Sequence, residues 1–296
     1  MTTMVTTQDG RRLAVELWGA RGGLPVFLFH GTPGSRFGPR PRESLLHRAG
    51  VRLIAYDRPG YGDSDRLDGR CVAHAASDVT AIADALGLGR FAVLGRSGGG
   101  PHALACAALL GERVVRAAVL VGLAPRDADG LDWYAGMTPG NVSAYQTAEA
   151  GPLAITSRFE VDAALIRRDP ASNLPFEHPG LPDSDRRVVA DFGLRSMLVS
   201  NFAEAVKTSG LGWVDDALSF VAGWGFDPGA IEAPVLLWHG ADDVFSPVSH
   251  TLWLAERIRG STLVVERGKA HFGSFTVTPR VLSWLAGRRP RQWRTA

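Results

Sequence analysis

The stretch FAVLGRSGGGPHALACAALL, residues 91–110, passes from apolar, β-favouring residues through a serine among glycines into small, helix-forming residues. This change predicts a buried strand that turns sharply into a helix. The turn carries the pattern G-x-S-x-G, with Ser97 at its centre, in the strand, turn and helix context that gives the pattern meaning. So tight a turn holds its central residue in a strained backbone conformation, and flanking glycines prevent clashes. We therefore predict that the Ser97 hydroxyl projects from a strand end, beside the backbone amide of Gly98 at the helix start.

The rest of the chain repeats this alternation of strand and helix. Short unbroken apolar runs, typical of strands buried on both faces, occur at residues 25–31, 51–60, 91–97, 117–123, 234–240 and 261–267. Helix-like segments occur at residues 74–88, 249–258 and 279–288. The opening residues 3–18 differ, because two alternating runs joined at Asp9-Gly10 indicate an antiparallel hairpin. We predict an α/β fold with a mostly parallel central sheet flanked by helices.

The strand rhythm stops after Ala124. Residues 125–229 contain amphipathic helical pieces, at 142–159 and 186–207, between turns rich in proline, glycine and asparagine. We therefore predict a core domain of residues 1–124 and 230–296 that carries a helical insertion of residues 125–229.

Composition limits the classes of partner. The 296 residues carry a formal net charge of only +2 with scattered arginines, which argues against a nucleic-acid partner, and the arginine-rich residues 287–296 are expected to be a solvated tail. No apolar run approaches a membrane span, and Cys71 and Cys106 show no disulfide or metal-ligand pattern. We expect a cytoplasmic protein with a small-molecule substrate, no membrane partner, and no metal or organic cofactor. The sequence does not predict an oligomeric state.

A serine nucleophile needs a base, and the base needs an orienting carboxylate. His271 is our choice of base because it follows the last apolar run on a glycine-lined loop, whereas His30 and His239 end their strands in His-Gly steps and are expected to support loops. Asp243 is our choice of carboxylate, with Asp242 next to it as the second choice. Asp127 and Asp129, after the preceding strand, are further alternatives.

Other polar residues lie at neighbouring strand ends. The amide of Thr32, in FHGTPGSR (29–36), is expected to form an oxyanion hole with that of Gly98. Arg96 either braces the turn or meets an anionic group of the substrate. Three charged residues of the next strand's loop are expected to stabilise it rather than catalyse: Asp57, Arg58 and Asp63. Several aromatic residues are expected to pack the insertion onto the core, and any that face the serine would favour an apolar substrate: Trp133, Tyr134, Phe192, Trp213, Phe220 and Trp224.

Taken together, these motifs resemble the α/β-hydrolase fold superfamily. The order Ser97, Asp243, His271 is that family's order, HGTPGS resembles its oxyanion turn, and DRPGYGDSD (57–65) resembles the loop after its next strand. The likeness spans residues 25–125 and 230–275, and it implies that the insertion is a helical cap. It also implies a serine hydrolase that cleaves an ester or lactone of a small, largely apolar substrate through an acyl-enzyme.

The resemblance leaves other activities open. A proline iminopeptidase is one, although this chain has HGTPG where those enzymes have HGGPG, and a hydrolase of carbon–carbon bonds is another. Cofactor-free haloperoxidase-like esterases share the same triad. A different class, a ligand-binding protein or biosynthetic cyclase on the same fold, would be expected to lack a triad residue, and none is missing here.

Overall fold

One twisted sheet forms the centre of the molecule. The computed structural model describes residues 2–174 and 180–288; His178 and residues 289–296 of the expected tail lie outside them. Within these residues the strands are β1 (Thr3–Thr6), β2 (Arg12–Gly19), β3 (Leu24–Phe29), β4 (Val51–Tyr56), β5 (Phe91–Arg96), β6 (Val114–Leu120), β7 (Val235–Gly240) and β8 (Thr262–Glu266). Their order is β1-β2-β4-β3-β5-β6-β7-β8.

Strand direction follows the sequence patterns. β1 and β2 pair antiparallel across the hairpin at Asp9-Gly10, and β2 pairs antiparallel with β4. The pairings from β4 through β3, β5, β6 and β7 to β8 are all parallel. The predicted α/β architecture with a mostly parallel sheet is therefore confirmed.

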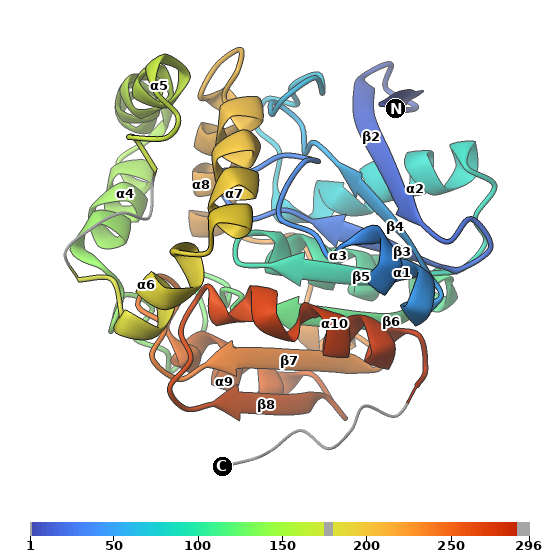
Figure 1. Ribbon diagram of the computed structural model, residues 1–296. Helices are drawn as coiled ribbons and strands as arrows, with labels where there is room; N and C mark the ends of the chain where they lie inside the picture. The colour runs from blue at the N-terminus through green and yellow to red at the C-terminus, as the bar shows by residue number, and fades with distance from the viewer. Residues whose placement is uncertain (1, 175–179, 289–296) are drawn as a thin grey trace.

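Helices cover both faces of the sheet, which explains the unbroken apolar runs. Val93 of β5 belongs to one buried cluster with residues of α2 (Ala75–Ala85), α3 (Gly99–Leu109) and α9 (Val248–Arg257). Leu94 points to the other face, into a second cluster with residues of α1 (Glu43–Ala49) and α10 (Gly273–Leu285). In Figure 1, α1 and α10 lie in front of the sheet and α3 lies behind it.

The helix predicted at residues 279–288 begins earlier, at Gly273, and contains Pro279 in its interior. Proline lacks a backbone N–H and is favoured in the first turn of a helix. In the structure it removes only one donor, and the hydroxyls of Thr276 and Thr278 bond to the carbonyls of Gly273 and Ser274 in the preceding turn. The residues before Pro279 therefore continue the helix.

Between β6 and β7 the described residues form the α-helices α4 (Pro139–Glu149), α5 (Pro152–Arg168), α6 (Asp183–Val189), α7 (Phe192–Ala205) and α8 (Leu211–Val221). Each of the two predicted helical pieces contains parts of two helices. Gly151, with φ of 116°, separates α4 from α5, and the Asp191 carboxylate caps α7 by accepting the N–H of Leu194 at 2.8 Å. We refer to α4–α8 as the helical insertion.

The helical insertion lies beyond the carboxyl ends of the strands, past the arrowheads of β5, β7 and β8 in Figure 1. Ion pairs attach it to the core: Glu204 of α7 lies 2.8 Å from Arg36, and the buried Asp216 of α8 lies 2.7 Å from the buried Arg70. The edge of the sheet where strand-end residues gather is thus covered by helices.

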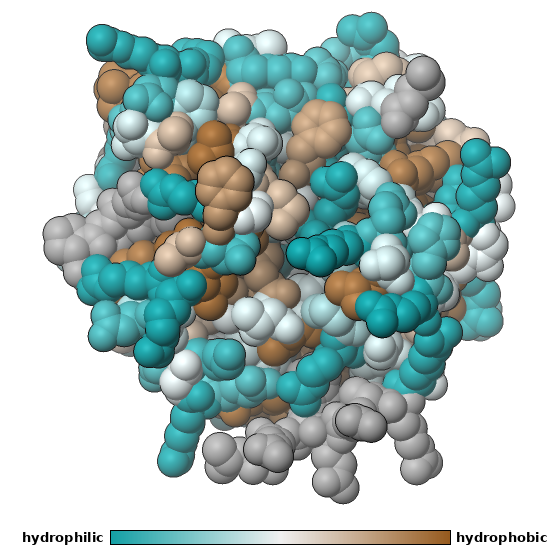
Figure 2. Space-filling view, viewed as in Figure 1, coloured by the Kyte–Doolittle hydropathy of each residue, from teal (hydrophilic) through white to brown (hydrophobic). Residues whose placement is uncertain are grey.

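The outer surface mixes residue types. On the face shown in Figure 2, hydrophobic and hydrophilic residues are interspersed without one continuous hydrophobic area. Two apolar side chains of the helical insertion, Leu153 and Phe192, are 86% exposed. Among the described helices, none is both long enough and apolar enough to cross a bilayer.

Candidate active site

The turn around Ser97 has the strained geometry that its glycines predict. Ser97 has φ of 54°, in the left-handed region that L-residues rarely occupy. Its N–H donates to the Leu120 carbonyl at 2.9 Å, and its own carbonyl accepts the N–H of Gly100 at 2.8 Å. A Cβ on Gly95 would lie 2.2 Å from the Gly99 carbonyl oxygen, and one on Gly99 would lie 2.3 Å from that of Phe29. The chain approaches so closely that only glycine fits at both positions.

His271 and Asp243 form a buried pair. His271 Nδ1 lies 2.8 Å from Asp243 Oδ2, and Asp243 Oδ1 accepts the N–H groups of Phe245 at 2.8 Å and Ser246 at 3.2 Å. Burial opposes ionisation of Asp243, but the neighbouring His271 and His239 rings and their hydrogen bonds outweigh it and hold the pKa of the carboxyl below its usual range. Asp243 is therefore a carboxylate at neutral pH, able to orient the His271 ring.

The alternative carboxylates occupy other environments, and His239, although its Nε2 lies 3.2 Å from Asp243 Oδ2, has both ring nitrogens engaged by other groups. The three alternative carboxylates are exposed: Asp127, Asp129 and Asp242. His239 is fully buried, with Nδ1 2.6 Å from Thr251 Oγ1 and Nε2 2.6 Å from the Ser246 carbonyl. His30 accepts the N–H of Arg58 at Nε2 (3.2 Å). Both rings support loops, as the sequence suggested.

One cavity brings the candidate residues together. A space of about 900 Å³ beneath the helical insertion is lined by Ser97, His271, Thr32 and Gly98. Apolar side chains make up much of its remaining wall, including Met137, Phe159, Trp213 and Phe245. Of the aromatic residues singled out from the sequence, Trp213 faces this cavity. Trp133, Phe220 and Trp224 are buried in the core, and Phe192 is exposed. The cavity accommodates a small, mainly apolar molecule beside the serine.

Thr32 and Gly98 lie against each other. A Cβ on Gly98 would lie 2.2 Å from Thr32 Oγ1. The Thr32 hydroxyl donates to Asp216 Oδ2 at 2.5 Å and accepts from Arg58 Nη2 at 3.0 Å. The side chain of Thr32 is therefore fixed by polar contacts, and one of its two partners belongs to the helical insertion.

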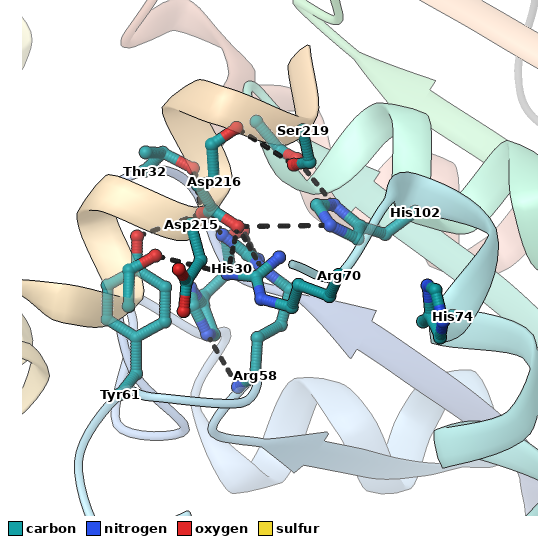
Figure 3. A network of polar contacts seen from close by, with 12 residues as sticks. His30, Thr32, Arg58, Tyr61, Arg70, His74, His102, Asp215, Asp216 and Ser219 are labelled. Carbon is teal, nitrogen blue, oxygen red and sulfur yellow. Dashed lines mark hydrogen bonds and ion pairs between the residues drawn. The ribbon is translucent and has the colours of Figure 1, made fainter. Parts of the chain in front are cut away.

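Asp216 is the centre of a buried ion cluster that we did not identify from the sequence. Figure 3 shows Arg58, Arg70 and Tyr61 gathered around its carboxylate. It forms an ion pair with Arg58 and accepts hydrogen bonds from Arg70 Nη2 at 2.7 Å and Tyr61 at 2.8 Å. Burial opposes ionisation of Asp216, but the two guanidinium groups outweigh it and hold its pKa well below the usual range.

One sequence signal pointed toward this cluster. Asp215 and Asp216 are adjacent carboxylates in the otherwise largely apolar segment 211–221, and buried carboxylates require partners. The interpretation of Arg58 as a loop-stabilising residue is incomplete, because its guanidinium reaches α8. Asp57 agrees with that interpretation, since it pairs with Arg36 and accepts the Arg36 N–H at 2.6 Å.

Arg96, next to Ser97, also lines the cavity. Its Cζ lies 4.0 Å from the centre of the Phe275 ring. Burial lowers its pKa to about 10, so it remains a cation at neutral pH. Over the residues that the structure describes, its guanidinium makes no hydrogen bond or ion pair.

No group of three or more His, Cys, Asp or Glu side chains in residues 2–174 and 180–288 could hold a metal ion. What the site offers instead is a strained serine and a carboxylate-bound imidazole on one cavity wall. This arrangement suits nucleophilic attack on a carbonyl carbon.

Comparisons with known proteins agree with this fold. The sequence profile of the alpha/beta hydrolase fold family matches residues 25–276. A non-heme haloperoxidase of Rhodococcus erythropolis is 28% identical over 297 residues, which cover 95% of this chain and 98% of that protein. A 2-hydroxymuconate semialdehyde hydrolase of Pseudomonas putida is 29% identical over 255 residues, covering 82% of this chain and 79% of that protein. An esterase of Exiguobacterium antarcticum matches with a TM-score of 0.67 at 23% identity, over 97% of this chain and 98% of the esterase chain. This chain therefore belongs to the alpha/beta hydrolase fold family and is a hydrolase.

Proposed function

We propose that this hydrolase cleaves an ester or lactone bond of a small, largely apolar substrate by a serine mechanism. Ser97 attacks the carbonyl carbon while His271 accepts its proton and returns it to the leaving oxygen. Asp243 orients the imidazole and stabilises it when charged. The backbone amides of Thr32 and Gly98 stabilise the oxyanion. Water, activated by His271, then hydrolyses the acyl-enzyme.

One observation carries this proposal: the 2.8 Å contact between His271 Nδ1 and Asp243 Oδ2, on the wall of the cavity that the strained Ser97 also lines. The remaining nitrogen of the ring, Nε2, is then the one available to exchange a proton with the serine hydroxyl. Within this proposal, residues 125–229 act as a cap that closes the cavity, and its apolar wall sets the preference for the acyl group. The free thiols of Cys71 and Cys106 are consistent with the cytoplasm as the proposed compartment.

A second candidate is hydrolysis of a carbon–carbon bond beside a ketone. The similarity to the 2-hydroxymuconate semialdehyde hydrolase of Pseudomonas putida favours it. The same serine, histidine and aspartate would serve, but the leaving group would be a carbanion that must be protonated at carbon.

The proposal is tested by labelling with a fluorophosphonate, read as intact mass, alongside steady-state hydrolysis of p-nitrophenyl butyrate and a series of lactones. We expect a single adduct on the wild type and none on Ser97→Ala or His271→Ala. Ser97→Ala should lower turnover on the order of a thousandfold or more, because the residues of a triad act as a unit. Asp243→Asn should label slowly, whereas its matched control Asp242→Asn should label at the wild-type rate, since Asp242 is exposed.

The outcomes separate the alternatives. An adduct that persists in Ser97→Ala would contradict the choice of nucleophile. A well-folded wild type that takes no label and cleaves no ester would favour the ligand-binding or cyclase class. Faster cleavage of prolyl p-nitroanilide than of any ester would favour a peptidase, and cleavage of a vinylogous 1,5-diketone would favour the carbon–carbon hydrolase.

A further inference from the structure

We propose that Asp216 is a positioning residue for catalysis: from helix α8 it holds Thr32, and so fixes the backbone turn that supplies one amide of the oxyanion hole. The inference rests on the proposed serine mechanism. It assigns a catalytic consequence to the helical insertion, which would otherwise serve only to enclose the substrate.

The first step of the argument is the Thr32 hydroxyl. It donates to Asp216 Oδ2 at 2.5 Å and accepts from Arg58 Nη2 at 3.0 Å, so both of its hydrogen-bonding roles are used. A hydroxyl held in both roles has one preferred side-chain rotamer. Since that rotamer also touches Gly98, any drift of Thr32 would change the spacing of the two residues proposed to bind the oxyanion.

The second step is the backbone of the same turn. Arg58 donates to the carbonyl of His30 and, through Nη2, to that of Gly31 at 3.1 Å. The Arg58 guanidinium thus holds the carbonyls of residues 30 and 31, and the Asp216 carboxylate holds the Thr32 hydroxyl. Arg58 and Asp216 also form an ion pair with each other. The turn and its supports form one connected unit (Figure 3).

The third step is the rigidity of Asp216 itself. Its side chain is fully buried, and it accepts from Arg70 and Tyr61 in addition to Thr32 and Arg58. Its backbone carbonyl accepts the Ser219 hydroxyl at 2.8 Å within α8. Because Asp216 is held rigidly, it keeps Thr32 in a fixed position. This matters for catalysis because preorganised donors stabilise a transition state only when they are held within a fraction of an ångström.

The test begins with Thr32, because removing its hydroxyl leaves Asp216 still paired with both arginines. Thr32→Val is expected to lower kcat for p-nitrophenyl butyrate by about tenfold, a fraction of the cost of deleting an oxyanion donor, with KM changed by less than about twofold. The rate of fluorophosphonate labelling should fall in parallel, because the phosphonyl oxygen occupies the same hole. Thr32→Ser, which restores the hydroxyl, should recover most of the loss.

The second arm uses the adjacent carboxylates of α8 as a matched pair. Asp216→Asn should lower kcat at least as much as Thr32→Val. Asp215→Asn should keep kcat within about twofold of the wild type, since Asp215 pairs with Arg66 at 2.9 Å and has no contact with the turn. In the double variant Thr32→Val/Asp216→Asn, kcat should fall no further than in the more impaired of the two single variants, because both substitutions break the same contact.

Several results would overturn the inference. They are an unchanged kcat in Thr32→Val, an equal loss in Thr32→Val and Thr32→Ser, or a lowered Tm in Asp216→Asn with an unchanged kcat. If Asp216→Asn does not fold, the Thr32 pair decides alone. A wild type that neither takes the label nor cleaves the ester would instead refute the proposed function, so the two failures are distinguishable.

A second observation, independent of the first, concerns Arg96. We infer that its guanidinium binds a carboxylate on the substrate, close to the bond that is cleaved. This inference also rests on the proposed function and refines its substrate class to acyl groups with an apolar body and an acidic end.

The unpaired state of Arg96 carries this inference. Within the described residues its guanidinium has no hydrogen bond or ion pair, and the carboxylates whose charges act on it, Asp185 and Asp243, do so without contact. The other arginine on the cavity wall, Arg158, is already engaged by the Ser143 hydroxyl at 2.9 Å and the Gly140 carbonyl at 3.3 Å. A half-buried guanidinium without a partner has lost part of its hydration, and a substrate carboxylate would satisfy it by a bidentate contact.

The position of Arg96 sets the length of the acyl group. A Cβ built on Gly31 would lie 3.4 Å from Arg96 Nη2 and 3.6 Å from Ser97 Cβ, so the guanidinium and the nucleophile flank the same residue. Only a short chain fits between an attacked carbonyl and a carboxylate bound there, which points to a four-carbon diacid ester.

The matched probes are p-nitrophenyl hemisuccinate and p-nitrophenyl 4-methylpentanoate, in which a carboxylate and an isopropyl group of similar shape occupy the same position. After correction for spontaneous hydrolysis, the wild type should favour the hemisuccinate by about tenfold in kcat/KM. Arg96→Met should abolish that preference, Arg96→Lys should retain part of it, and Arg158→Gln should leave it intact.

A wild type that cleaves the 4-methylpentanoate as well as the hemisuccinate would overturn this inference while leaving the serine mechanism standing. The same holds if Arg96→Met and Arg158→Gln lower the preference equally. Cleavage of neither ester would refute the proposed function itself.

Discussion

Arg58 and Arg96 are two arginines next to Gly31 with opposite surroundings. Arg58 is almost fully buried and is ion-paired with Asp216, and it donates to two backbone carbonyls. Arg96 rests on the Phe275 ring and has no such partner within the described chain. The paired cation fixes the shape of its surroundings, whereas the unpaired one keeps its hydrogen-bonding capacity for a ligand.

Solvation physics explains why both arrangements persist. Taking an ion out of water costs several kcal/mol, which a well-placed partner of opposite charge largely restores. For Asp216 the protein's own arginines supply the partners that restore the lost solvation free energy. The same contacts join α8 to the loops after β3 and β4. At Arg96 the protein bears part of the cost in the free state, and a bound anion would relieve it. Local instability of this kind is typical of functional sites.

The largest expected effect on stability comes from removing the partner of Arg58. Asp216→Ala leaves two buried guanidinium groups without their shared carboxylate, and we expect the free energy of unfolding to fall by about 3–5 kcal/mol. Asp215→Ala, in the same turn of α8, removes a buried carboxylate whose arginine partner is 34% exposed and can still be hydrated, so it should cost less, about 1–2 kcal/mol. Urea titrations at pH 7 with a common m-value measure both. Equal losses in the two variants would show that Asp216 stabilises the fold no more than a single carboxylate paired with one half-exposed arginine.

A smaller effect of opposite sign tests the unpaired side. Replacing Arg96 by methionine removes a cation that lacks a partner and keeps an apolar side chain against Phe275. We expect the free energy of unfolding to stay level or rise by about 1–2 kcal/mol, although the preference for the carboxylate ester is lost. The same urea titration measures it. A fall of 2 kcal/mol or more would mean that Arg96 braces the turn, as in the first alternative considered from its sequence position.

The strand that precedes Ser97 and the turn itself were predictable because their physical requirements are local. A strand buried on both faces needs an unbroken apolar run, and residues 91–94 supply it. The close approach of Gly95 to Gly99 tolerates no side chain, so the pattern of glycines predicts the tight turn. His271 and Asp243 were chosen because they follow strand ends, and the structure places them in contact. Their catalytic roles remain predictions.

The Asp216 cluster could not be predicted from the sequence, because only the fold brings its members together. Asp216 lies 158 residues from Arg58 and 184 from Thr32 along the chain. No periodicity relates residues so far apart, and α8 itself was not among the helical pieces identified. The pair of aspartates in a largely apolar segment indicates a need for cations, but the cations, Arg58 and Arg70, come from the distant segment between β4 and α2. The same limit applies to Arg96, whose lack of a partner is visible only when every neighbour is placed.

The smallest expected effect extends the comparison from arginines to carboxylates and concerns acid stability. The pKa of Asp243 is held below its usual range, so as pH falls below about 4 the unfolded chain takes up a proton there that the folded protein does not. The folded state therefore loses stability on acidification, by about 1 kcal/mol between pH 5 and pH 3 for one such group. Asp57 acts in the opposite direction. Burial raises its pKa to about 6 despite the charge of Arg36, so its protonation favours the folded state as pH falls toward 5.

Asp243→Asn should reduce the drop in unfolding free energy between pH 5 and pH 3 by about 1 kcal/mol, and Asp242→Asn should leave it as in the wild type. Urea titrations at the two pH values decide the point, because an unchanged drop in Asp243→Asn would mean that this carboxylate is not held ionised by its two histidine neighbours.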